Sequence, residues 1–252
     1  MKLFKYKPQA LRRTYIPKAN GKLRTLGIPT YKDKLVQGVM ANILNEIYES
    51  RFLDCSYGFR PNRNCHDAIS RIKKSIMIRP VTYILDEYIK GFFDNVHHKW
   101  LIKFLENDIE DKNFIRHIAR FLKPGIKKKE IIKEILKEIP RGELITPVLV
   151  NRYLHYVLDT WVEKWIKSMT KGYEEIVRYA DDFIVMFQYE NEANSFYEVL
   201  KKMLLKFNLE LEESKTRIIP FGRLKGSKDS FYFLFIRKVR LGEGNKKIAQ
   251  MN

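Results

Sequence analysis

The chain has 252 residues, of which 45% are hydrophobic and 13% aromatic, enough for a substantial buried core. Lys and Arg number 48 against 30 Asp and Glu, which gives a net charge of +18 at pH 7. This excess predicts a polyanionic partner, a nucleic acid. The alternative is a basic surface that serves only solubility.

Cysteine content and hydropathy exclude further classes. Cys55 and Cys65 are the only cysteines, too few for a disulfide framework and without the spacing of a zinc site. The amino terminus has no apolar segment of signal-peptide length and no run of about 18 apolar residues is present, so we expect neither export nor a membrane span. The sequence therefore predicts a cytoplasmic protein.

The first half of the chain predicts a hairpin followed by helices. In residues 13–28, β-branched and basic residues alternate around Asn20-Gly21, which indicates strand, turn and strand. Apolar spacing predicts a helix over 33–50, and a second helix runs to about 75 after the polar loop 57–63. A buried strand is predicted over 81–85.

The second half predicts an α+β fold. Helices are expected at 98–107 and 111–122, a long helix begins at Pro147, and residues 126–138 fit either a helix or an extended hairpin. Apolar runs over 175–179 and 183–187 flank Ala180-Asp181-Asp182 as a β-hairpin. A helix over 191–207 and strands near 216–220 and 231–236 complete a small antiparallel sheet, which we expect helices to cover on one face.

The paired carboxylates Asp181 and Asp182 are the first candidate site. Phosphoryl transfer to a nucleic-acid strand uses two Mg²⁺ ions about 3.5–4 Å apart, and Mg²⁺ prefers hard oxygen ligands. Adjacent aspartates on a tight turn can supply part of that site. Four residues alone also fit a solvent-exposed turn without chemistry.

Several further segments resemble, in order and spacing, the motifs of group II intron-type reverse transcriptases. They are Arg13-Thr14-Tyr15-Ile16-Pro17-Lys18, the segment 21–30, Tyr57-Gly58-Phe59-Arg60-Pro61, Ile89-Lys90-Gly91-Phe92-Phe93-Asp94-Asn95-Val96, the segment 147–155, Tyr179-Ala180-Asp181-Asp182, Glu213-Ser214-Lys215-Thr216 and Pro220-Phe221-Gly222. The resemblance covers residues 11 to 236, nearly the whole chain.

The resemblance implies a right-hand polymerase fold and RNA-directed DNA synthesis. Fingers are expected over 1–80, a palm over 81–240 with a finger insertion at about 99–146, and a tail over 241–252 where a thumb would begin. The thumb and the maturase-type domain are expected to be missing. The implied cofactor is Mg²⁺, and the implied partners are an RNA template, a DNA primer, dNTP and intron RNA.

The resemblance also implies roles for individual residues. Asp181 and Asp182 match the metal-binding catalytic pair. Phosphates, nucleotide and primer are expected to contact Lys18, Lys22, Arg24, Phe92, Arg141 and Lys215, with Phe233 and Leu234 in the primer grip. A solvated basic strand face is the alternative for the finger cations, and core packing is the alternative for Phe92.

Tyr88 breaks the family pattern. It stands where the family has the aspartate that bridges both metals, and a phenol is neutral at pH 7 and a weak ligand. Asp86 is the neighbour that could substitute for the missing carboxylate, because it lies two residues earlier on the same strand face, but it is displaced by about 6–7 Å. Glu87 points to the opposite face. We therefore expect the two-metal site to be weak or lost and catalysis to be impaired.

Two other active-site segments depart from the family. Arg141 and Glu143 stand where the family has glutamine and glycine before the central helix, and Phe235 replaces a glycine after Phe233-Leu234. Three hypotheses remain open: an impaired RNA-directed DNA polymerase, a non-catalytic RNA-binding remnant of an intron-encoded protein, and a decayed reading frame.

Overall fold

The computed structural model of the chain describes residues 6–17, 21, 23–122, 141–214, 216–221, 232–233 and 236–237. Internal packing divides the chain into two compact units, Met1–Arg51 with Gly91–Tyr153 and Phe52–Lys90 with Leu154–Asn252. Fingers, palm and tail are functional divisions, and their expected boundaries stay predictions. The ambiguous segment 126–138 lies outside the described residues.

The first unit contains the predicted hairpin and most of the predicted early helices. Its elements are β1 (Arg12–Pro17), β2 (Leu23–Ile28), α1 (Tyr31–Tyr48), α3 (Phe92–Asn95), α4 (His98–Glu106), α5 (Lys112–Phe121) and nearly all of α6 (Thr146–Leu154). β1 and β2 pair antiparallel, with Thr14 opposite Leu26. Thr30 caps the N-terminus of α1, because its hydroxyl accepts a hydrogen bond from the Asp33 amide.

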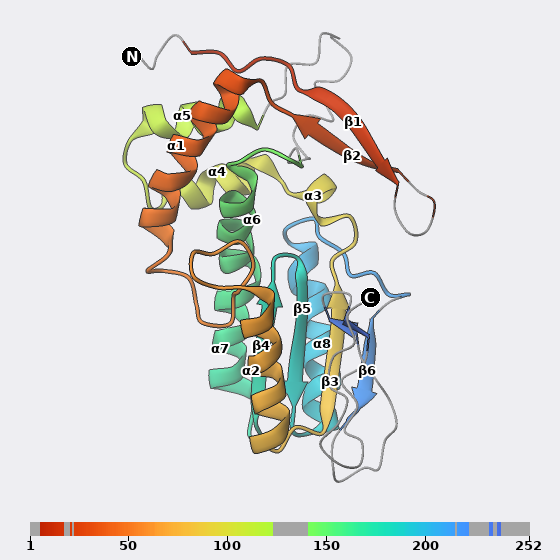
Figure 1. Ribbon diagram of the computed structural model, residues 1–252. Helices are drawn as coiled ribbons and strands as arrows, with labels where there is room; N and C mark the ends of the chain where they lie inside the picture. Colours follow the sequence, from red (N-terminus) through yellow and green to blue (C-terminus); the bar gives the residue numbers. More distant parts are fainter. Residues whose placement is uncertain are drawn as a thin grey trace. The chain divides into compact units, whose positions relative to one another are not determined.

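The second unit is built on a four-stranded antiparallel sheet in the order β4-β5-β3-β6 (Figure 1). Its elements are α2 (Cys65–Ile78), β3 (Tyr83–Tyr88), a π-helical turn (His155–Asp159), α7 (Thr160–Met169), β4 (Glu174–Tyr179), β5 (Asp182–Phe187), α8 (Glu190–Leu205), β6 (Arg217–Pro220), β7 (Tyr232–Phe233) and β8 (Ile236–Arg237). The α+β class and the small antiparallel sheet are confirmed.

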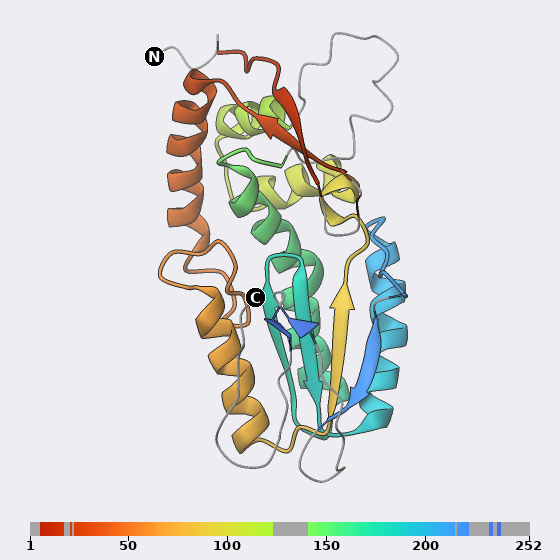
Figure 2. The same ribbon diagram turned by 45° about the vertical axis from the view of Figure 1, so that its right-hand side comes forward.

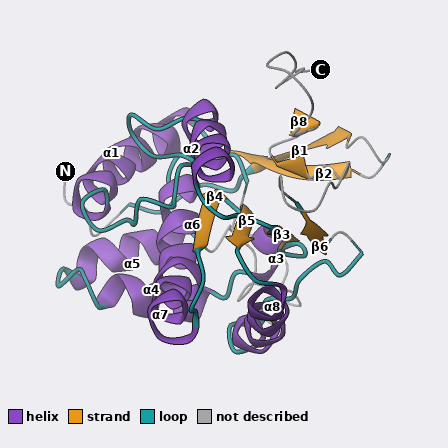
Figure 3. Ribbon diagram, turned by 90° about the horizontal axis from the view of Figure 1, so that it is seen from below, coloured by secondary structure: helices purple, strands orange, loops and turns teal. Residues whose placement is uncertain are grey.

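Helices cover both faces of this sheet, so the expectation of one covered face is wrong. Ile84, Ile184 and Met186 pack with α2 on one face. On the other face Phe187 contacts Phe196 of α8. Consecutive strand residues point to opposite faces, and both Met186 and Phe187 are fully buried. Both faces of the sheet are therefore covered. Figure 3 shows α2 and α8 on opposite sides of the strands.

Two further elements differ from expectation. The long helix from Pro147 is interrupted by the π-helical turn His155–Asp159, a register shift that apolar spacing does not reveal. The single strand expected near 231–236 is instead a pair of two-residue strands, β7 and β8, with Phe233 opposite Ile236. Among the described residues no helix is long and apolar enough to cross a membrane. The cytoplasmic location stays a prediction.

Candidate active site at the turn between β4 and β5

The two aspartates lie at the tight turn that joins β4 to β5, as the sequence predicted. Tyr179 pairs with Asp182 at the end of the ladder, and Ala180 and Asp181 form the turn. Ala180 adopts a left-handed backbone conformation with φ of 57°, which is uncommon for a residue with a side chain. Both aspartates are partly exposed, so their carboxylates can meet a ligand from solvent.

Tyr88 lies directly beside this turn. It is the last residue of β3 and pairs with Asp182 across the β3–β5 ladder. Residues directly opposite each other in an antiparallel pair share a face of the sheet. Figure 2 shows the end of β3 and the β4–β5 turn at the same end of the sheet. A carboxylate at position 88 would therefore lie on the same face of the sheet as Asp182.

The Tyr88 phenol engages the carboxylate beside it. Its hydroxyl forms a side-chain hydrogen bond with Asp182. Partial burial raises the pKa of Tyr88 above its ordinary value, and the negative charges of Asp182 and Asp86 raise it further. The phenol is therefore neutral at pH 7 and donates a proton to the hydrogen bond, so it adds no negative charge to the site.

The neighbouring acids do not complete a metal cluster. Asp86 pairs with Ile184, one step further from the turn on the same face, and only 3% of it is exposed. Glu87 points to the opposite face, where the Thr216 hydroxyl donates to its carboxylate at 2.8 Å. In the part of the chain that the structure describes, no three His, Cys, Asp or Glu side chains gather closely enough to hold a metal ion.

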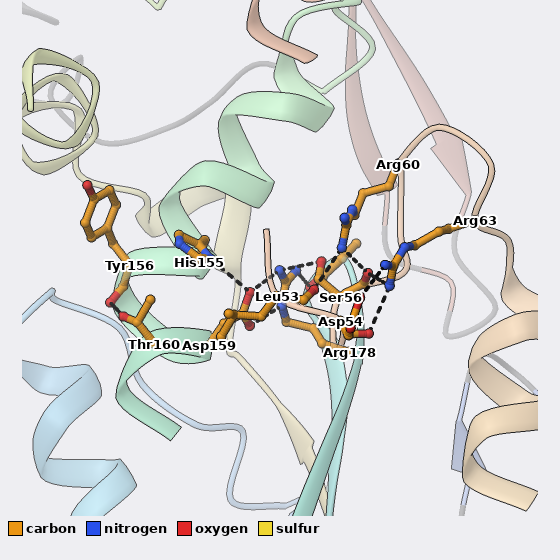
Figure 4. Close-up of polar contacts among 11 residues, drawn as sticks. Leu53, Asp54, Ser56, Arg60, Arg63, His155, Tyr156, Asp159, Thr160 and Arg178 are labelled. Atoms are coloured by element: carbon orange, nitrogen blue, oxygen red, sulfur yellow. Dashed lines mark hydrogen bonds and ion pairs between the residues drawn. The ribbon is translucent and has the colours of Figure 1, made fainter. Parts of the chain in front are cut away.

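Sequence reasoning missed a buried arginine, Arg178, two residues before the turn; Figure 4 shows its polar contacts with Asp159 and Ser56. Arg178 and Asp159 are both fully buried. Nε and Nη2 of Arg178 each donate to one carboxylate oxygen of Asp159 at 2.7 Å. Nη2 also donates to the Ser56 hydroxyl at 2.7 Å, and Nη1 donates to the Ala180 carbonyl at 2.8 Å. The one available signal was an arginine directly after the apolar pair Ile176-Val177 in the predicted strand.

The loop before α2 packs against the same strand. The Arg178 amide donates to the Cys55 carbonyl, and the Tyr57 amide donates to the Arg178 carbonyl, both at 2.8 Å. Arg60 Nη1 donates to the carbonyls of Leu53 and Ser56 at 2.8 and 2.9 Å. The segment predicted as a finger motif therefore belongs by its packing to the same compact unit as the aspartates.

The other predicted site residues fall in several places. Phe92 is 1% exposed and packs against Phe93 and Tyr153, as in the core-packing alternative. The Arg141 guanidinium lies 4.8 Å from the Phe93 ring centroid and 3.5 Å from the Asp94 carboxylate. Outside the described residues lie Lys18, Lys22, Lys215 and Leu234, together with the side chains of Arg24 and Phe233. Their substrate contacts stay predictions.

Glu143, one of the departures from the family pattern, is buried in the first unit. Gln37 Nε2 donates to one of its carboxylate oxygens at 3.0 Å, and the Gln37 side-chain oxygen Oε1 accepts from the Leu144 amide at 2.9 Å. Glu143 is 5% exposed, and burial raises the pKa of its carboxyl from 4.5 to about 7. The Glu143 carboxyl therefore holds its proton to higher pH in the folded chain than in the unfolded chain.

We expect Glu143→Gln to stabilise the chain above pH 7. Because the pKa of Glu143 is higher in the folded state, its contribution is fully present below about pH 4.5 and is lost as pH rises through about 7. The amide has no charge to bury, so the variant should gain roughly 1–3 kcal/mol over the natural chain at pH 8. Urea unfolding at pH 4.5 and 8 measures this difference. An equal difference at both pH values, or the same pattern in the exposed control Glu110→Gln, would contradict it.

Comparison with known proteins agrees with the geometry. Residues 16–236 match the family model described as reverse transcriptase (RNA-dependent DNA polymerase). Protein YkfC of Escherichia coli K12 is 32% identical over 269 residues, which cover 93% of this chain and 68% of that protein. The group II intron-encoded protein LtrA of Lactococcus lactis subsp. cremoris is 41% identical over 158 residues, 62% of this chain and 26% of LtrA.

Solved structures share the fold at low identity. A telomerase from Candida albicans, solved with a TWJ fragment of telomeric RNA, superposes with a TM-score of 0.67 at 14% identity. The match covers 94% of this chain and 45% of the telomerase chain. The chain thus spans less than half of this telomerase and about a quarter of LtrA.

Proposed function

Because the chain belongs to the reverse transcriptase (RNA-dependent DNA polymerase) family and is of group II intron type, we propose that it binds RNA as a template-binding polymerase module with impaired nucleotidyl transfer. RNA template, DNA primer and dNTP are the proposed ligands, and intron RNA is a further proposed partner. The observation that carries the polymerase proposal is the pair Asp181 and Asp182 at the β4–β5 turn. The expected impairment rests on Tyr88, which lies opposite Asp182 and forms a hydrogen bond with it.

The described side chains do not fit the Mg²⁺ pair that the family implies. Two ions that share one site need several anionic oxygens to offset their charge. Asp181 and Asp182 supply two carboxylates, and the third position offers a neutral phenol whose proton lies in the bond to Asp182. We therefore assign no catalytic step of the natural chain to bound magnesium.

RNA binding does not depend on that cluster. The net charge of the whole chain, +18, supports its electrostatic attraction to the phosphates of RNA. The telomerase of similar fold was solved with an RNA fragment, which supports an RNA ligand for this chain. A non-catalytic RNA-binding role is the second candidate, and Tyr88 is the observation that favours it.

We expect binding to a structured RNA to weaken steeply with salt. Each phosphate neutralised contributes about −0.7 to −0.9 to the slope of log K against log salt, so six or more contacts lower affinity about 10³-fold between about 50 and 200 mM. Fluorescence anisotropy with a labelled RNA hairpin measures the slope. Asp181→Ala is the matched control, and we expect it to bind at least as tightly because it removes a negative charge. An affinity that does not change with salt would contradict the proposal.

Primer extension separates the two candidates. The natural chain is incubated with an RNA template, a DNA primer, dNTP and Mg²⁺, beside the Asp181→Ala variant. Product clearly above that of Asp181→Ala supports an impaired polymerase. RNA binding with product equal to that of Asp181→Ala supports the non-catalytic role.

A further inference from the structure

The turn that carries Asp181 and Asp182 is held from the inside by a guanidinium. The two hydrogen bonds from Arg178 to the Asp159 carboxylate fix the plane of the guanidinium group, because a bidentate pair leaves it no freedom to rotate. With that plane fixed, Nη1 points at the carbonyl of Ala180. Arg178 thus reaches the backbone of the turn that follows it in the chain.

The Ala180 backbone needs such support. A left-handed conformation is unfavourable for any residue with a Cβ and persists where surrounding contacts hold it. Ala180 is one residue before Asp181, so a change in its φ and ψ would re-aim the following carboxylates. The hydrogen bond from Arg178 to its carbonyl opposes that change.

The loop before α2 also packs closely against the turn. A Cβ added to Gly58 would lie 2.5 Å from the backbone nitrogen of Ala180, so glycine is required for this close approach. Ser56 of the same loop accepts from Arg178, and Arg60 holds the Ser56 carbonyl. The loop therefore contacts both the guanidinium and the turn.

We propose that Arg178, fixed by Asp159 and Ser56, is a positioning residue that sets the geometry of the Tyr179–Asp182 turn and so aims the paired aspartates. The proposal rests on the proposed function in one respect, namely that these aspartates are the functional carboxylates. It adds a role for the loop before α2, which the resemblance assigned to the fingers. The simpler alternative is a buried ion pair that serves stability alone.

The test places 3-fluorotyrosine at position 88 and records its ¹⁹F resonance at pH 7. The ring at this position contacts Asp182 through a hydrogen bond, so the resonance reports where the turn lies. Gly58→Ala is the positive control, because its Cβ must displace the Ala180 backbone. Val177→Ala is the stability control, since Val177 is fully buried at the adjacent position of β4, belongs to the apolar cluster that includes α2, and makes none of the hydrogen bonds that join Arg178 to Asp159, Ser56 and Ala180.

We expect Arg178→Lys to move the resonance beyond its linewidth, in common with Gly58→Ala, while Val177→Ala leaves it in place. Lysine keeps the charge but cannot bond Asp159 and Ala180 together. Ser56→Ala, which removes one contact and leaves the ion pair, should give a smaller shift and serves if the lysine variant does not fold. An unmoved resonance in both Arg178→Lys and Ser56→Ala, or an equal shift in Val177→Ala, would overturn the proposal.

A second readout separates this inference from the proposed function. In chains that also carry Tyr88→Asp, Arg178→Lys should lower kcat for DNA synthesis more than Val177→Ala does at matched stability. Two chains are compared. A ¹⁹F shift in the 3-fluorotyrosine chain together with no synthesis by the Tyr88→Asp chain counts against the polymerase assignment and leaves the positioning role supported. Synthesis by the Tyr88→Asp chain with no ¹⁹F shift in the Arg178→Lys and Ser56→Ala variants supports the polymerase assignment and counts against the positioning role.

Discussion

Tyr88→Asp is expected to raise Mg²⁺-dependent DNA synthesis on an RNA template by roughly 10²- to 10³-fold. A bound metal ion contributes several kcal/mol of transition-state stabilisation, and each 1.36 kcal/mol corresponds to a factor of about ten. The backbone at position 88 already lies opposite Asp182 on the same face of the sheet. The substitution therefore adds the missing carboxylate without a change in the strand.

The matched control for this variant is Tyr88→Asn. Asparagine has nearly the shape of aspartate and also removes the phenol, but it has no charge. If steric relief were the cause, both variants would gain activity. We expect a gain only with aspartate, and the gain should disappear when Asp181→Ala is added. Equal synthesis by the natural chain, Tyr88→Asp and Tyr88→Asn would contradict the electrostatic explanation.

Arg178→Ala is expected to lower the free energy of unfolding by roughly 3–5 kcal/mol. Removal of one partner of a buried ion pair leaves the other charge without compensation, here the fully buried Asp159 carboxylate. The variant also leaves the Ala180 carbonyl without its arginine donor. Urea unfolding followed by circular dichroism measures the change.

Two comparisons make this expectation specific. The double variant Arg178→Met/Asp159→Leu should lose less stability than Arg178→Ala, because neither residue then buries a charge. Lys167→Ala breaks an ion pair with Glu163 of similar length, 2.8 Å, but the lysine side chain is 71% exposed. That change should cost less than about 1 kcal/mol. An equal cost for Lys167→Ala and Arg178→Ala would contradict the assignment.

Local pattern was sufficient for much of the fold. The alternation of residues around Asn20-Gly21 predicted the β1–β2 hairpin, and apolar runs around Asp181 predicted the β4–β5 hairpin. The two-residue period of a strand also placed Asp86 on the face of Tyr88 and Glu87 on the other. These features depend on neighbours in sequence, which is why they could be read without a structure.

Features that depend on distant partners could not be predicted in this way. Asp159 and Arg178 are 19 residues apart, and Ser56 is 122 residues from Arg178. Each charge stands inside an apolar segment, where periodicity indicates core and names no partner. The π-helical turn that contains Asp159 is likewise a small register shift within a long apolar stripe.

The position of the loop before α2 shows the same limit. Its motif, Tyr57-Gly58-Phe59-Arg60-Pro61, was assigned to the fingers by resemblance. In the structure the Tyr57 amide bonds the Arg178 carbonyl, and Gly58 approaches Ala180 closely. A glycine at a close backbone contact becomes interpretable only when the neighbouring strand is known.

The most direct test of the central claim is metal binding without turnover. Mn²⁺ alone is titrated into the natural chain, Tyr88→Asp and Tyr88→Asn, and bound ion is measured by electron paramagnetic resonance. The third carboxylate should allow Tyr88→Asp to bind Mn²⁺ at least about tenfold more tightly than either other chain, a difference of about 1.4 kcal/mol. If the natural chain binds Mn²⁺ as tightly as Tyr88→Asp, the claim that Tyr88 weakens the site is wrong.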